Sequence, residues 1–183
     1  QDREKEIITR RFGLFDRRET LEQIGELLGI TRERVRQLEK AILIRLKIAS
    51  EENKVPAIHE VERTIVRPLS ANVRVGRVKD VTNSIVGKDS DDRHRAHIAF
   101  VSELSPNLVV IGENDHYHHA VGIKEYGDEK KIKGNVDEIV KTIKAHGEPL
   151  QIEALHAKLN HEHPSQVRAL ASTSKHLASL KDH

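Results

Sequence analysis

Four polar side chains near the start of one expected helix could hydrogen-bond to nucleic-acid base edges: Arg32, Glu33, Arg36 and Gln37. Their spacings of one, three and four residues place them on one face of a helix, opposite an apolar face. Arginine can donate two hydrogen bonds to guanine, glutamine can pair with adenine, and glutamate can accept a bond from cytosine N4. These residue types therefore predict a helix that reads bases in the major groove of duplex DNA.

The charge around these residues supports the same interpretation. Residues 30–47 carry six Lys or Arg side chains against two Glu, whereas the whole chain has a formal net charge of only +2. A basic helix in a near-neutral chain is typical of a local phosphate-facing surface. Alternating Arg and Glu can also mark an ordinary solvated helix face with i,i+4 pairs, so the charges alone leave both interpretations open.

Two capped helices joined by a short turn are expected to position the four side chains. Thr20 opens the first of them with a capping box whose partner is Gln23. Gly29 lies where a tight turn needs a positive φ, and Thr31 caps the helix that follows. Helix, glycine turn and helix in this order predict a helix-turn-helix.

A further helix is expected before this pair, from a cap at Asp2 to a stop at Gly13. The apolar residues of all three helices recur at helical spacing and should form one small core. Those expected to face inward are Ile7, Ile8, Leu21, Ile24, Leu27, Leu28, Val35, Leu38, Ala41, Ile42 and Leu46.

The segment from Thr20 to Glu39 closely resembles region 4 of the primary sigma factors of bacterial RNA polymerase. The order T-R-E-R-V-R-Q-L-E after an L-G-I turn carries the resemblance, and residues 3–14 match the helix that leads into the motif. The resemblance extends over residues 1–48. It implies a DNA-binding protein of transcription initiation that reads a −35-like promoter element and docks on the flap of the RNA polymerase β subunit.

The resemblance also implies roles for individual residues. It assigns base contacts to the four polar side chains Arg32, Glu33, Arg36 and Gln37. It assigns contacts with backbone phosphate to the start of the supporting helix, where free N–H groups favour an anion. The residues expected at the DNA backbone are Thr20, Leu21, Thr31, Arg34 and Lys40.

A second module is expected over residues 56–126. Helices are predicted over residues 58–69, 75–86 and 92–104, followed by strands over residues 108–111 and 117–123. Three helices and then a β-hairpin form the order of a winged helix. The alternation between Val73 and Val81 leaves a strand open as the alternative for part of the second helix. The charged segment 127–134 is interpreted as a linker.

A third module is expected over residues 133–183, with helices over residues 136–145 and 152–159 and another opening at Pro164. The segment Val136–Leu150, with its His-Gly-x-Pro-Leu turn, resembles the start of a HARE-type helix-turn-helix, a winged-helix family that includes the delta subunit of bacterial RNA polymerase. This resemblance implies contact with DNA or polymerase. The closing hairpin expected after Leu177 has no counterpart in the sequence.

The composition argues against several other functions. The chain has no Cys and no Trp, and aromatic residues make up 3% of it, which disfavours disulfides, thiolate metal sites and single strands stacked on aromatic rings. Two His-rich segments, 115–119 and 161–163, could place metal ligands side by side, but we expect no metal and no cofactor. Neither a nucleophile–base set nor a phosphate-cradling glycine loop is evident, so we expect no enzyme and no small-molecule substrate.

The location and extent of the chain are also expectations at this point. The sequence has no membrane-spanning run and no secretory leader, which predicts a cytoplasmic protein that does not enter membranes. Gln1 is interpreted as a cut or missing start, so that upstream domains are not in view.

We therefore predict a mainly α fold of tandem helix-turn-helix and winged-helix modules with a small β-hairpin wing, divided at residues 1–50, 56–126 and 133–183. Its expected function is sequence-specific binding of double-stranded DNA in transcription initiation, with bacterial RNA polymerase as a partner. The alternative is a stand-alone DNA-binding regulator or architectural protein that does not bind polymerase. A protein whose helical modules bind only other proteins is a third possibility.

Overall fold

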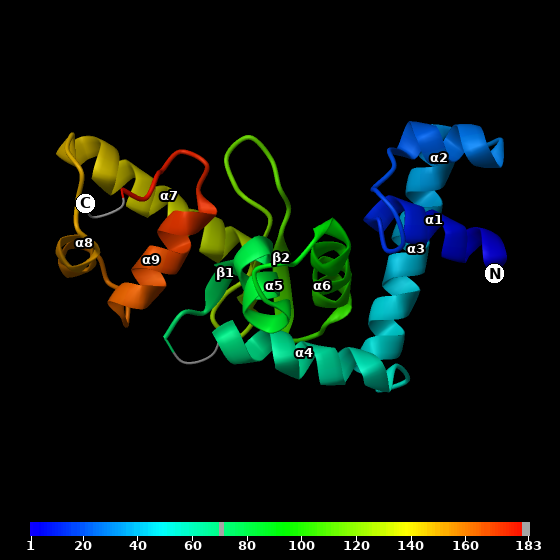
Figure 1. Cartoon of the computed structure of the whole chain (residues 1–183), viewed down its shortest axis with the longest axis horizontal. Helices are drawn as coiled ribbons and strands as arrows, with labels where there is room; N and C mark the ends of the chain where they lie inside the picture. Colours follow the sequence, from blue (N-terminus) through cyan, green and yellow to red (C-terminus); the bar gives the residue numbers. More distant parts are fainter. Residues whose placement is uncertain (70–71, 181–183) are drawn as a thin grey trace.

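The first fifty residues form three helices around a small apolar core in the computed structural model, which describes residues 1–69 and 72–180. The helices are α1 (Asp2–Phe12), α2 (Leu21–Leu28) and α3 (Arg32–Glu51). Ile7, Ile24 and Val35 are completely buried where the three helices meet. Figure 1 shows this module at one end of the molecule, the sheet in the middle and the last helices at the other end.

The predicted boundaries of these helices are confirmed, except for the cap of α1. Two residues that were predicted to lie in the core are exposed. Gly13 and Gly29 end α1 and α2 in the left-handed conformation, as their positions predicted. Asp2 was wrongly predicted as the cap of α1, because it is the first helical residue, where its charge still favours the positive helix end. Leu27 is 54% exposed and Ala41 is exposed, so neither belongs to the core.

The middle of the chain has the topology of a winged helix. Its elements are α4 (Pro56–Leu69), β1 (Val75–Arg77), α5 (Val78–Val86), α6 (Asp92–Leu104), β2 (Leu108–Ile111) and β3 (Ala120–Ile123). The strands form one antiparallel sheet in the order β1-β3-β2. The predicted helix from residue 75 begins only at Val78, because Val75–Arg77 pairs with β3. The strand that the alternation between Val73 and Val81 left open is therefore present over these three residues.

The final segment contains α7 (Glu129–His146), α8 (Ile152–Lys158) and α9 (Pro164–Thr173). The interpretation of residues 127–134 as a linker was wrong. Asp128 caps α7 by accepting a hydrogen bond from the Lys131 backbone N–H at 2.8 Å, and Ile132 in its first turns is completely buried. A charged stretch therefore forms a helix because one apolar residue in it packs against the sheet.

The sheet is covered on both faces. Alternate residues of β3 point to opposite sides: Val121 and Ile123 join the core with α4, α5 and α6, whereas Ala120 joins the core with α7, α8 and α9. A Cβ atom on Gly122 would lie 2.7 Å from Ile132 Cδ1, so the glycine permits α7 to lie close to the strand. Residues 56–126 and the last three helices thus share one sheet, while the predicted module boundaries stay predictions.

The chain after α9 pairs with the β2–β3 loop. Tyr117 and Ser174 form an isolated β-bridge, so the predicted strand 117–123 shortens to β3 and this single bridge. The His118 N–H donates to the Thr173 carbonyl at 2.8 Å, and the Lys175 N–H donates to the His116 carbonyl at 2.9 Å. The hairpin loop is therefore held by the end of the chain.

One face of α6 packs against the first module. The rings of Phe100 and Phe12 are 5.0 Å apart, and the His97 Nε2–H donates to the Leu14 carbonyl oxygen at 2.7 Å. Glu103 forms a 3.3 Å ion pair with Lys47 of α3. In a winged helix this helix corresponds to the one that usually enters the DNA groove, but here these side chains contact protein.

Among the helices within residues 1–69 and 72–180, none has the length and apolar character needed to cross a membrane.

Phe100→Ala is expected to loosen the contact between α6 and the first module. Phe100 is half-buried against Phe12, so the loss should be about 2 kcal/mol, below the full cost of emptying a buried Phe site. Urea unfolding measures the loss, and hydrogen exchange should become faster in α1. Phe15→Ala is the matched control, because Phe15 is 67% exposed and should change stability by less than about 0.5 kcal/mol. Equal effects of the two substitutions would contradict the packing role of Phe100.

Stability is expected to fall as the pH falls below 6.5, in part through His119. Burial lowers the pKa of the His119 imidazole from its ordinary value of 6.5, and the positive charge of Arg18 lowers it further. The unfolded chain then binds more protons than the folded one, so acid favours unfolding in this window. Urea titrations at several pH values should show a weaker decline for His119→Gln than for the wild type; an unchanged decline would refute the contribution of His119.

Candidate nucleic-acid interface

The four predicted base-contacting side chains lie together on the exposed side of the first two turns of α3. Thr31 caps this helix by accepting a hydrogen bond from the Arg34 backbone N–H at 3.1 Å. Val35 faces inward and is completely buried, which turns the opposite side of the helix to solvent. The exposed side chains are Arg32, Glu33, Arg36 and Gln37.

These side chains pair with one another and with α2. Arg36 donates two hydrogen bonds to the Glu33 carboxylate, at 2.9 and 2.7 Å, and thereby lowers the pKa of Glu33. Gln37 Nε2 lies 3.5 Å from the same carboxylate, and Arg32 forms a 2.7 Å ion pair with Glu22 of α2. Exposed ion pairs of this kind contribute little to stability, so base edges can replace them at low cost.

The predicted DNA-backbone residues occupy different environments. Thr20 and Gln23 form the predicted capping box: the Thr20 hydroxyl accepts from the Gln23 N–H at 3.2 Å, and Gln23 Oε1 accepts from the Thr20 N–H at 2.8 Å. Leu21 is buried in the core, so only its backbone N–H could meet a phosphate. Arg34 and Lys40 are exposed on α3. The assignment of these residues to DNA contacts stays a prediction.

Gly25 is a positioning residue that the sequence analysis did not identify. It is buried inside α2, and its carbonyl accepts the Ile30 N–H at 2.9 Å across the turn. A Cβ atom at this position would lie 2.7 Å from the Ile30 carbonyl oxygen. Gly25 therefore lets the turn pack against α2 and fixes where α3 begins; a glycine inside an otherwise helical pattern was the available signal.

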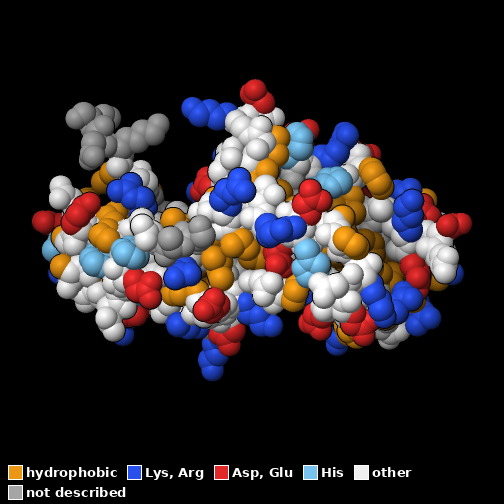
Figure 2. Space-filling view, turned by 90° about the horizontal axis from the view of Figure 1, so that it is seen from below, with side chains coloured by type: hydrophobic (Ala, Val, Ile, Leu, Met, Phe, Trp, Pro, Cys, Tyr) orange, Lys and Arg blue, Asp and Glu red, His pale blue; other side chains and the backbone are white. Residues whose placement is uncertain are grey.

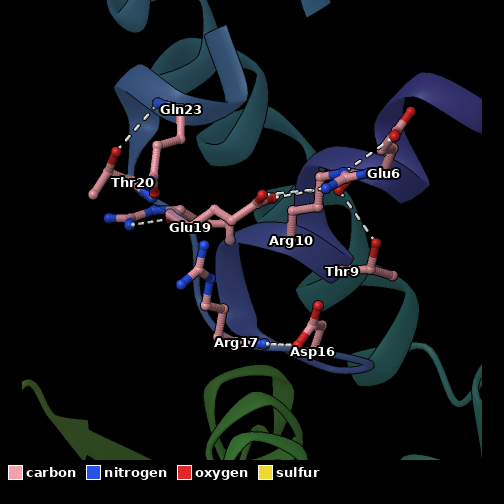
Figure 3. A network of polar contacts seen from close by, with 9 residues as sticks. Glu6, Thr9, Arg10, Asp16, Arg17, Glu19, Thr20 and Gln23 are labelled. Carbon is pink, nitrogen blue, oxygen red and sulfur yellow. Dashed lines mark hydrogen bonds and ion pairs between the residues drawn. The ribbon is translucent and has the colours of Figure 1, made fainter. Parts of the chain in front are cut away.

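Ion pairs from α1 brace the two helices of the motif, and the sequence analysis did not anticipate them. Arg11 Nε lies 3.2 Å from Glu39 of α3, and Arg10 contacts both Glu6 and Glu19 at 3.1 Å. Figure 3 shows Arg10 between Glu6 and Glu19, next to the capping box at the start of α2. The supporting helix and the helix with the exposed polar face are thus both tied to α1.

Charge elsewhere on the surface is mixed. Figure 2 shows Lys and Arg side chains interspersed with Asp and Glu over the face that it presents. The two His-rich segments have different partners: His116 Nδ1 is 2.8 Å from His176 Nε2, whereas His156 Nε2 donates to the His161 carbonyl at 2.8 Å. On the face shown, attraction to a polyanion would have to come from local groups of cations.

A capped helix with an exposed polar face, a supporting helix and a glycine turn define a helix-turn-helix DNA-binding module. Residues 1–47 match the family described as Sigma-70, region 4. They are also similar to "RNA polymerase sigma factor sigB" of Arabidopsis thaliana, with 52% identity over 46 residues, which is 25% of this chain and 8% of that protein. No solved structure matches the chain. The first module is thus a helix-turn-helix that matches Sigma-70, region 4.

Gly25→Ala is expected to destabilise the protein by about 1–3 kcal/mol, because the added methyl group collides with backbone and not with a flexible side chain. Gly134→Ala in α7 is the matched control. No atom lies within 4 Å of the Cβ built there, so this substitution should stabilise the helix by roughly 0.5–1 kcal/mol. Urea unfolding of both variants tests the difference, and a stabilising effect of Gly25→Ala would show that the close approach is not required.

Proposed function

We propose that this protein binds double-stranded DNA sequence-specifically in transcription initiation and reads a −35-like promoter element with α3. The observation that carries the proposal is the exposed group of Arg32, Glu33, Arg36 and Gln37 on the first turns of a capped helix within a region 4 motif. The N-terminal residues of a recognition helix are those that reach base edges in the major groove.

The proposed mechanism is an exchange of hydrogen-bond partners. On binding, Arg36 leaves Glu33 and donates both bonds to a guanine, which frees the Glu33 carboxylate to accept from a cytosine N4 group. Arg32 similarly exchanges Glu22 for a base, and Gln37 pairs with an adenine. Each good pair contributes about 1–3 kcal/mol of discrimination against the wrong base.

Backbone contacts hold this helix in register on the duplex. The free N–H groups at the start of α2, including that of Leu21, are directed at a phosphate, and the positive end of the helix favours the anion there. Thr20 and Thr31 lie at the two helix starts, and Arg34 and Lys40 add positive charge along α3. Such contacts contribute affinity without sequence preference.

We further propose that the region 4 module contacts RNA polymerase, on the flap of its β subunit. The support is the match to Sigma-70, region 4 and the name of the similar protein, an RNA polymerase sigma factor. A binding titration with core polymerase, with and without DNA, distinguishes this role from that of a stand-alone DNA-binding regulator. DNA recognition without measurable polymerase binding would favour the stand-alone regulator.

Arg36→Ala is expected to reduce the preference for a −35-like duplex over a scrambled duplex by roughly 5- to 150-fold, the equivalent of one lost bidentate contact. Fluorescence anisotropy titrations with both duplexes measure the ratio of the two dissociation constants. Arg63→Ala, which removes an exposed arginine from α4, is the control and should leave this ratio unchanged. Base reading by α3 is excluded if the wild type shows no preference, or if both variants lose it equally.

A further inference from the structure

The loop between α1 and α2 holds two arginines that have no role in the helix-turn-helix described above. Arg17 and Arg18 are exposed and lie three and two residues before Thr20, near the proposed phosphate-binding start of α2. Within residues 1–69 and 72–180, neither guanidinium forms an ion pair. In Figure 3 the Arg17 side chain points away from Asp16 and toward Glu19 and Thr20.

The loop is held in one conformation by contacts that leave both guanidinium groups exposed, beside the carboxylate of Asp16. The Leu14 N–H donates to the Thr9 carbonyl and the Glu19 N–H donates to the Arg10 carbonyl, both at 3.0 Å. Arg10 neutralises the Glu19 carboxylate at 3.1 Å. Asp16 accepts the backbone N–H of Arg17 at 2.8 Å. A fixed loop loses less conformational freedom when its side chains bind a ligand.

The positive charge continues onto the winged helix. The bond from His97 to Leu14 holds the loop beside α6, and Arg18 is close enough to His119 to lower the pKa of that buried imidazole. Figure 1 shows the β2–β3 loop projecting toward the same edge of the molecule as α2. Arg18 therefore lies on the side of the region 4 module that faces α6 and His119.

Arg77 supplies a further cation at the hairpin loop. Its terminal nitrogen lies 3.3 Å from both ring nitrogens of His118. Burial lowers the pKa of His118, and the charges of Arg77 and Lys175 lower it more than the nearby carboxylates of Glu113 and Asp80 raise it. Glu113 also lies 3.6 Å from Lys175. Arg77 is thus the cation with the largest charge effect on this imidazole.

We propose that Arg17 and Arg18, together with Arg77 on the winged helix, bind the sugar-phosphate backbone of the duplex beside the bases that α3 reads. Arg18 is two residues from Thr20, which places it within about 7 Å of the start of α2, the distance between neighbouring phosphates. Guanidinium groups bind phosphate oxygens through paired hydrogen bonds. The winged helix thereby lengthens the DNA contact without entering a groove through α6. This inference rests on the proposed DNA binding.

The test compares the salt dependence of DNA binding by the full chain and by Arg17→Gln/Arg18→Gln. Losing two phosphate contacts should reduce the slope of log affinity against log salt by about 1.8, so that the loss of affinity between roughly 50 and 200 mM salt becomes about tenfold smaller. Affinity at low salt should fall equally for the −35-like and scrambled duplexes. Arg63→Gln/Lys124→Gln removes two exposed cations, one from α4 and one directly after β3, and is the matched control. An unchanged slope, or the same reduction in both double variants, overturns the inference.

A second measurement locates the contact. The chain contains no cysteine, so Asp16→Cys can carry a tethered iron chelate that cuts nearby DNA backbone. We expect cuts on one side of the −35-like element, which weaken when Arg77→Gln is added. Cuts only within the element, or none, contradict the inference. The proposed function is judged separately, by the ratio of affinities for the two duplexes and its loss in Arg36→Ala.

Discussion

The burial of β3 on both faces is the constraint on which most of the structure depends. This strand pairs with β1 and β2, and its alternate residues enter two different apolar cores. Neither helical group alone can bury both faces of this short strand, because each group covers only one face. The winged helix and the last three helices therefore cover opposite faces of one sheet, and α6 contacts the region 4 module through Phe100 and His97.

The parts of this structure that could be predicted from the sequence are those set by neighbouring residues. Thr20 with Gln23, Thr31, and the glycines that follow α1, α2 and α7 fix helix ends by local hydrogen bonds and by left-handed backbone conformation, so their residue types are sufficient. The exposed polar face of α3 was predictable for the same reason, since its position follows from the buried Val35 and the helical period.

The features that were not predicted depend on residues far away in the chain. The alternation between Val73 and Val81 left helix and strand open, and pairing with β3, more than forty residues later, decides for a strand over Val75–Arg77. Residues 129–134 are helical because Ile132 reaches Gly122. Ala41 has an apolar side chain at a position that no other element covers. The role of Gly25 required knowing how closely the turn approaches α2. Local propensity does not predict such contacts, because tertiary packing decides them.

The length of α3 sets the distance between its polar face and the start of α4. This single helix of 20 residues begins with the polar face and ends where the chain enters α4, so it spans about 30 Å. Its first turns are braced by Glu39 and Arg11, and its end is fixed by the bond from His59 to the Ser50 carbonyl, at 3.0 Å. An unbroken helix anchored at both ends works as a rigid spacer. The distance and rotation between the polar face of α3 and the winged helix are therefore fixed, and under the proposed DNA binding this would let the molecule measure spacing along a duplex.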